Sequence, residues 1–165
     1  MNLAHSNSSH NEFGEEEIRD IVVRSYSIIG SIRGMGSSFV QVEAREAVVP
    51  DQRLMDYSVR IELSTGGDYP QVSLASVGYK DLERFVSMLD KLTNTNISTD
   101  RFDFSEVQYE LDGFRIIVFN NDRGSLMVAL SHEGVTVHFT SVSSISDLRK
   151  LVTSAKESLD RYKIN

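Results

Sequence analysis

Apolar and polar residues alternate along much of the chain, and this alternation twice leads into a helical pattern. In the first block, residues 39–49, 57–64 and 72–74 alternate, as strands with one buried face do. The next stretch carries apolar residues at i, i+3, i+4, i+7 and i+10, namely Leu82, Phe85, Val86, Leu89 and Leu92. These patterns predict a first unit over residues 18–94, made of strands and then a helix.

The second block repeats this order with clearer boundaries. Residues 107–111 and 114–119 alternate on either side of Asp112-Gly113, a pair typical of tight β-hairpin turns. Two further alternating runs follow at 126–130 and 135–139, and residues 144–162 carry an apolar stripe at helical spacing. We therefore predict a second unit over residues 105–165, separated from the first by a linker at 95–104.

The two blocks also share a sequence motif at the junction between the last strand and the helix. VSLASVGYKDLERFV recurs as VHFTSVSSISDLRKLV, so that Asp147 stands 66 residues after Asp81. One repeat of this length indicates two small units with a common core, because a solenoid needs more copies. The predicted fold is α+β: a tandem ββββα repeat with two antiparallel four-stranded sheets and two helices packed on a shared core.

The beginning of the chain is harder to interpret. Residues 1–17 are polar and acidic, and we expect a disordered tail. Residues 18–29 show apolar positions near helical spacing, yet they are rich in β-branched residues, which favour a strand. The repeat needs an early strand, so a strand is predicted over 20–29. The glycines at 30, 34 and 36 then indicate a hairpin turn, because no Lys-Ser/Thr follows them as in a phosphate-binding loop.

Composition narrows the classes of function. The chain has no cysteine, which excludes disulfides, thiol catalysis and cysteine-based zinc sites. The chain lacks an apolar run of the roughly 18 residues that a membrane span needs, and its first residues do not resemble a secretory signal. We expect a cytoplasmic protein with no membrane contact. The net charge is −7, much of it near the N-terminus, whereas strong phosphate binders are usually basic.

Catalytic motifs are missing from the sequence. It contains no GxSxG, HExxH or P-loop, and the candidate bases reduce to His132, expected in a solvated turn, and His138, expected on the outward face of a strand. We therefore expect no enzyme, no catalytic residue, no cofactor and no metal.

The outward faces of the two predicted sheets differ. The first is polar, with Gln41, Glu43, Arg45, Ser58, Arg60, Glu62 and Ser73. The second is partly apolar, with Arg115, Ile117, Phe119, Met127, Ala129, Thr136 and His138. Exposed apolar residues on a sheet imply a partner. Three interpretations stay open: another part of the chain covers this face, a second subunit does, or bases stack on Phe119 beside Arg115.

The two strand-to-helix junctions resemble those of the Whirly family and of the related positive-cofactor-four and Pur families. The resemblance spans residues 20–162 and is one of topology. In place of the Lys-Gly-Lys-Ala-type signature of plant Whirly proteins, this chain has SIRGMGSSFVQV, with Arg33 as its one basic residue. The resemblance implies the tandem fold described above and binding of single-stranded nucleic acid through the sheet faces.

The resulting functional hypothesis is a non-enzymatic module for single-stranded nucleic acid. Its expected binding residues are Arg24, Arg33, Arg45, Arg60, Arg115, Phe119 and Arg123. The alternative is a protein-interaction or assembly module, forming a homo-oligomer, with no nucleic-acid role. Local charge separates the two, because arginines neutralised by neighbouring carboxylates would favour the assembly module.

Overall fold

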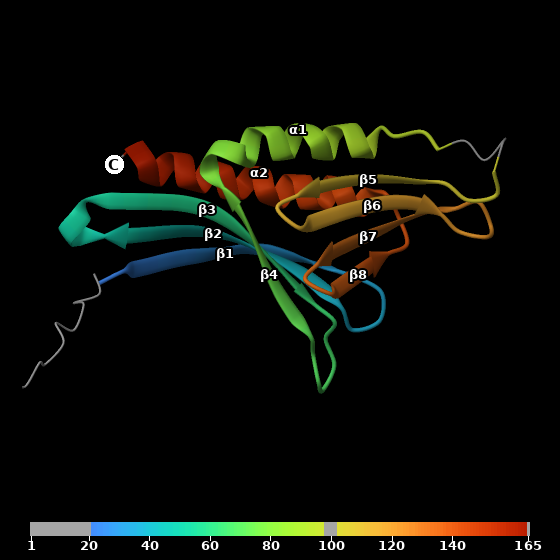
Figure 1. The fold of residues 1–165 in the computed structure, drawn as a ribbon, viewed down its shortest axis with the longest axis horizontal. Helices are drawn as coiled ribbons and strands as arrows, with labels where there is room; N and C mark the ends of the chain where they lie inside the picture. Colours follow the sequence, from blue (N-terminus) through green and yellow to red (C-terminus); the bar gives the residue numbers. More distant parts are fainter. Residues whose placement is uncertain (1–20, 98–101, 165) are drawn as a thin grey trace, which may run out of the picture.

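The computed structural model describes residues 21–97 and 102–164 and has the predicted α+β fold (Figure 1). Two antiparallel four-stranded sheets are each followed by a helix, in the order ββββα, ββββα. This confirms the fold class. The predicted tail at 1–17 lies outside the described residues, as does the centre of the predicted linker.

The first sheet has its strands in sequence order, and each pairs with the next: β1 (Val23–Arg33), β2 (Phe39–Val49), β3 (Leu54–Ser64) and β4 (Val72–Gly78). A 3-10 turn, Pro50–Gln52, joins β2 to β3. The segment of ambiguous pattern is a strand, as predicted, but it extends to residue 33 because the whole segment pairs with β2. A β-bulge between Ile28 and Gly30 shifts the register of this pair by one residue.

The second sheet has the same simple order, with β5 (Glu106–Leu111), β6 (Phe114–Asn120), β7 (Leu126–His132) and β8 (Val135–Phe139). The predicted hairpin at Asp112-Gly113 is confirmed, since both residues have positive φ angles, 48° and 82°. A tight turn of this kind fixes the register of β5 and β6, which pairs Leu111 with Phe114.

Helix α1 (Leu82–Thr93) follows a 3-10 turn, Tyr79–Asp81, and begins at the first residue of the predicted apolar stripe. Helix α2 (Ser143–Ile164) runs beside α1 and lies across β1, β2 and β3 of the other unit (Figure 1). Buried side chains from both sheets and both helices form one continuous core. The apolar stripes of the two helices therefore meet in a shared interior, as expected.

Two polar residues that the sequence predicted to be exposed are buried. Ser73 was expected on an outward face, but it pairs with Leu63 on the core side of the first sheet and is buried. His132 was expected in a solvated turn, yet it is the last residue of β7 and is buried too. The Ser73 Oγ and His132 Nδ1 atoms lie 2.5 Å apart, so this polar pair joins the two sheets. Each prediction failed because the partner comes from the other unit.

The turn between β1 and β2 makes a second connection between the sheets. The Met35 backbone N–H donates to the His138 carbonyl of β8 at 2.9 Å. Gly34 permits this approach, because a Cβ there would lie 2.5 Å from a Val137 methyl group. Across the described part of the chain, no helix is long and apolar enough to cross a membrane.

Candidate functional site

Strand β1 is an open edge of the first sheet. It pairs with β2 on one side, and within the described residues no strand pairs with its other side. The eight residues from Ser25 to Ile32 carry no charge and no proline. Native proteins usually protect an edge of this length with charged residues or proline. The second sheet does so at β5, where Glu106 and Glu110 are exposed.

The outward side of β1 is apolar and exposed. Tyr26 and Ile28 are each 61% exposed and stand on the sheet face turned away from the helices. The Arg45 guanidinium lies 5.3 Å from the centre of the Tyr26 ring and is also 3.0 Å from the Glu43 carboxylate. This arginine is therefore held by a ring on one side and a carboxylate beside it.

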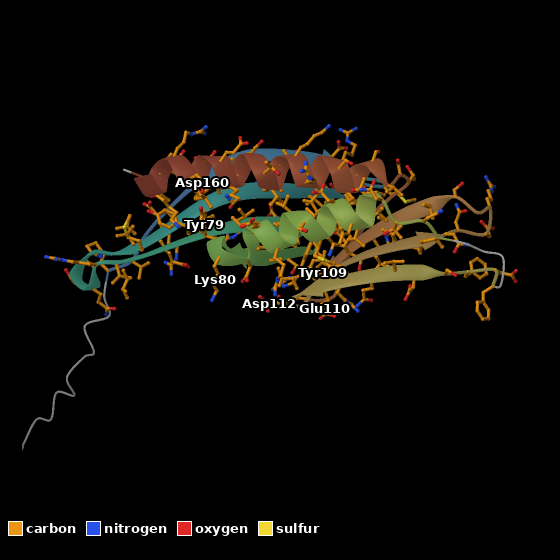
Figure 2. The ribbon with its side chains drawn as sticks, turned by 90° about the horizontal axis from the view of Figure 1, so that it is seen from above. Tyr79, Lys80, Tyr109, Glu110, Asp112 and Asp160 are labelled. Atoms are coloured by element: carbon orange, nitrogen blue, oxygen red, sulfur yellow. The ribbon has the colours of Figure 1, made fainter. Side chains whose placement is uncertain are left out.

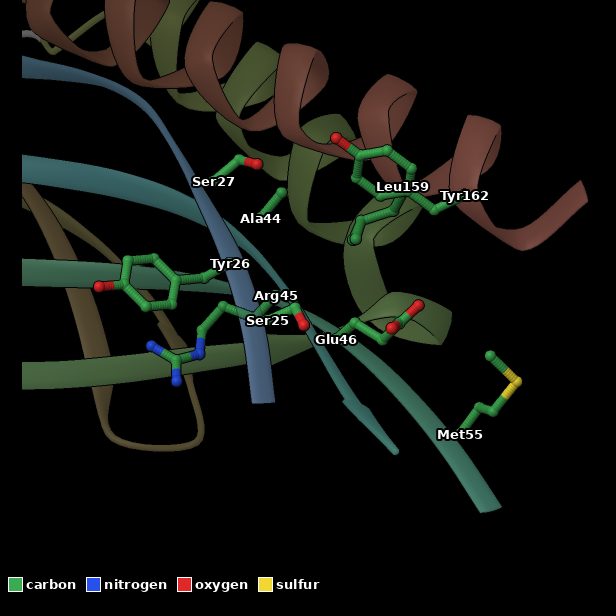
Figure 3. Close-up of a pocket in the computed structure, with 9 residues that line it drawn as sticks. All are labelled: Ser25, Tyr26, Ser27, Ala44, Arg45, Glu46, Met55, Leu159 and Tyr162. Carbon is green, nitrogen blue, oxygen red and sulfur yellow. The ribbon is translucent and has the colours of Figure 1, made fainter. Parts of the chain in front are cut away.

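The inward side of β1 is unusually small. Ser25 and Ser27 face the helix layer, where larger apolar residues would fill the core, and both stay exposed. They border a cavity of about 450 Å³ between the sheet and the C-terminal part of α2. Figure 3 shows Ser27 and Ala44 pointing toward this helix, whereas the Tyr26 ring points to the opposite side. On its helix side, the free edge of β1 therefore borders an open groove.

The walls of the cavity are mostly apolar, with one carboxylate on the helix side and Arg45 at the border next to Tyr26. Leu159 and Tyr162 of α2 form the roof, and Met55 of β3 lies at the far end (Figure 3). Glu46 of β2 is the acidic group, and within the described residues it forms no ion pair. Partial burial, together with a hydrogen bond to Glu46, raises the pKa of the neighbouring Tyr57 hydroxyl. The cavity can therefore accept an apolar group and, beside it, a cation.

The residues expected to bind nucleic acid lie in three places. Arg24, Arg45 and Arg60 line one depression on the outward face of the first sheet. Arg33 ends β1 at the opposite end of that strand. Arg115 and Phe119 are on β6 of the second sheet, and Arg123 is in the turn that follows it.

Carboxylates accompany most of these arginines. Asp56 lines the same depression as Arg24, Arg45 and Arg60. Arg45 forms its ion pair with Glu43, which is itself opposite Arg60 across the strands. On the second sheet, Arg115 stands opposite Glu110. The positive charge is therefore largely balanced on both faces.

The outward face of the second sheet is less exposed than its sequence suggested. Ile117, Phe119 and Met127 are half-buried, since they pack beside one another in neighbouring rows of the sheet. Phe119 borders a hollow together with Phe104, which is exposed. The most exposed apolar strand residues of the described chain are instead on the first sheet, at β1 and at the beginning of β3.

A polar cluster near the end of α2 connects the two helices (Figure 2). The Tyr79 hydroxyl donates a hydrogen bond to Asp160, and Lys156 Nζ lies 3.1 Å from the other oxygen of that carboxylate. These two hydrogen bonds lower the pKa of Asp160. The same bonds raise the pKa of Tyr79 and that of Lys156. Lys163 Nζ lies 3.5 Å from the centre of the Tyr79 ring. The cluster closes one end of the helix layer, next to the cavity.

The sequence suggested that the end strands of both sheets could join a partner, but it did not single out the β1 edge and it did not predict the cavity. Their signal was present in the alternation of Tyr26 and Ile28 with Ser25 and Ser27, in a segment whose strand character was itself uncertain. The roof of the cavity had no such signal, because it comes from α2, more than a hundred residues later.

Within residues 21–97 and 102–164, no group of three or more His, Asp or Glu side chains could hold a metal ion. No protein-family model matches the chain, and no curated protein matches it in sequence.

Proposed function

We propose that the protein is a non-enzymatic interaction module that binds another polypeptide along β1. The observation that carries this proposal is the open, uncharged edge from Ser25 to Ile32, with exposed apolar residues on one side and a cavity on the other. An extended peptide adds to such an edge through main-chain hydrogen bonds, while pockets for alternate side chains supply specificity. The balanced charge around the arginines also favours a polypeptide over a polyphosphate partner.

The test is a selection of phage-displayed random decapeptides on the full chain, followed by fluorescence anisotropy with labelled copies of the selected peptides. Ile28→Lys should weaken their binding at least tenfold, because a lysine on an edge strand opposes strand pairing. Leu74→Lys is the matched control. Leu74 is an exposed apolar residue on the outward face of β4, so its replacement should leave binding unchanged.

A second candidate is the single-stranded nucleic-acid module, favoured by the stacked Tyr26–Arg45 pair between Arg24 and Arg60. An aromatic ring beside cations is the arrangement on which bases stack. Titration of a labelled thirty-nucleotide oligonucleotide at two salt concentrations separates the candidates. Micromolar, salt-dependent binding that Arg60→Ala weakens would replace the polypeptide proposal, and the same would hold if Ile28→Lys left the selected peptides bound.

A further inference from the structure

The cavity between β1 and α2 indicates which side chains a partner strand needs. In a sheet, neighbouring strands place their side chains in common rows, with Cβ atoms about 4.5–5.5 Å apart. A strand added to β1 would therefore put alternate side chains on the helix side, directly beside Ser25 and Ser27. Those two residues are small, so the new side chains would extend over them into the cavity of about 450 Å³.

The roof of the cavity selects an apolar group at one of these rows. The row through Ser27 continues to Ala44 of β2 and Val59 of β3, all on the core side and without charge. Ala44 and Val59 are already buried, and the exposed apolar residues of the cavity lining on the helix side are Met55 and Tyr162. A large apolar side chain beside Ser27 would enter the cavity toward Met55 and Tyr162 and displace water from their apolar surface.

The next row selects a cation. The row through Ser25 continues to Glu46 and then to Tyr57. Because Ser25 is short, a lysine or arginine on the added strand can extend across it toward the Glu46 carboxylate. The two rows are two residues apart on one strand, so the expected partner pattern is a large apolar residue and a basic residue separated by one position.

A second copy of this chain does not supply that pattern. The core-side residues of β1 are Val23, which is half exposed, Ser25, Ser27 and Gly30, together with Ile29 and Ile32, which already pack on their own core. Antiparallel pairing of β1 with its own copy could bring Val23 into the row of Ser27, but no larger free apolar side chain. No lysine or arginine lies on this side of the strand either.

We infer that an extended segment of a different polypeptide binds as a fifth strand along β1, with a large apolar side chain in the cavity beside Ser27 and a lysine or arginine beside Ser25 facing Glu46. This inference rests on the proposed function, because it specifies the strand partner of the same edge. The ligand class is an extended segment in which one residue separates a large apolar residue from a basic one. Their order along the segment depends on whether it runs parallel or antiparallel to β1.

The experiment uses the decapeptides selected on the full chain, labelled and titrated against variants. Ser27→Phe fills the cavity and should weaken binding about tenfold to a hundredfold, the range expected from losing one buried apolar side chain. Ser31→Phe is the matched control, since it places the same ring on the outward face of the same strand. Replacing the apolar residue of the peptide by alanine should cause a comparable loss.

Exchanging the charges of Glu46 and of the basic peptide residue tests the row through Ser25. This test does not require the Ser27→Phe variant to fold. Glu46→Lys should weaken the selected peptides, and a peptide whose basic residue is replaced by glutamate should regain affinity for this variant. Thermal melts establish that each variant is folded before titration.

The outcomes separate the two proposals. Peptides that need an intact β1 but tolerate both Ser27→Phe and Glu46→Lys would overturn this inference and leave the interaction module standing. The absence of any β1-dependent peptide would overturn both. A dimer in light scattering that Ser27→Phe abolishes, without peptide binding, would identify a second copy as the occupant and also overturn the inference.

Discussion

Side-chain size at each position of β1 decides whether the space between this strand and α2 is filled. At Gly30 the missing side chain lets Leu151 of α2 approach, since a Cβ there would lie 2.8 Å from a Leu151 methyl carbon. At Ser25 and Ser27, nearer the end of α2, the side chains are small but the helix no longer fills the space above them. Small residues thus close the core at one end of the strand and leave it open at the other.

Polar residues hold the helix layer together beside that opening. Tyr79 precedes α1 and Asp160 belongs to the last turns of α2, so their hydrogen bond joins the beginning of one helix region to the end of the other. Lys156 donates to the same carboxylate. The carboxylate therefore accepts two bonds that orient the residues next to the cavity.

Tyr79→Phe should lower the free energy of unfolding, because it removes one hydrogen bond to a charged acceptor. Urea denaturation at neutral pH measures this change. Tyr69→Phe is the control, since Tyr69 is almost fully exposed and its hydroxyl should contribute nothing measurable. Equal stabilities of the two variants would contradict the role of the Tyr79 hydroxyl.

The same variant should change the response to pH in a definite direction. The folded pKa of Asp160 is lowered, so its contribution is complete above the ordinary carboxylate pKa and is lost as pH falls through the folded value. The folded pKa of Tyr79 is raised, so its contribution is complete below the ordinary tyrosine pKa and is lost as pH rises. Wild type should lose more stability than Tyr79→Phe at both extremes.

Sequence patterns predicted those secondary-structure elements that depend on neighbouring residues alone. The stripe from Leu82 to Leu92 predicted α1, and Asp112-Gly113 predicted the tightest hairpin. Pairings between units had no local signal. Ser73 and His132 look like surface residues in sequence, because a serine in a strand and a histidine before a turn usually are. The cavity escaped prediction for the same reason, since Leu159 and Ser27 belong to opposite ends of the chain.

The turns between strands also make contacts that only glycine permits. Gly66 has a φ of 66°, and a Cβ there would lie 2.0 Å from the Ser37 carbonyl oxygen in the β1–β2 turn. Gly67 has a φ of 79° with no atom near the Cβ position. Both glycines therefore have a left-handed backbone, but only Gly66 is in close contact with another turn.

Gly67→Ala should lower the free energy of unfolding by about 1–2 kcal/mol, the cost of a left-handed backbone with a side chain. Gly66→Ala should cost a further 1–3 kcal/mol or so, because the two turns must also move apart. Chemical denaturation of both variants measures the difference. If they are equally stable, the close approach of the turns is not important for stability.

At the scale of the whole molecule, the two repeats are interleaved. Helix α2 belongs to the second unit in sequence but lies across the first three strands of the first. Phe85 of α1 contacts Phe114 of β6, with ring centres 6.0 Å apart. Each unit therefore supplies part of the cover that the other sheet needs.

Neither unit should fold alone. A fragment of residues 18–94 leaves the core side of β1, β2 and β3 without α2, and a fragment of residues 105–165 leaves Phe114 without Phe85. Each should melt without a cooperative transition in circular dichroism, and mixing the two fragments should restore one. A sharp transition for either fragment by itself would show that the repeats are independent domains.

The long stretch of chain between β3 and α2 has a consequence for biosynthesis. A ribosome releases β1, β2 and β3 well before it has made the helix that covers them, and at ordinary rates of synthesis this interval lasts several seconds. During that time Val42, Val59 and Ile61 are exposed on a nascent sheet whose outer strand is also unpaired. We therefore expect the emerging polypeptide to bind chaperones until α2 has left the exit tunnel.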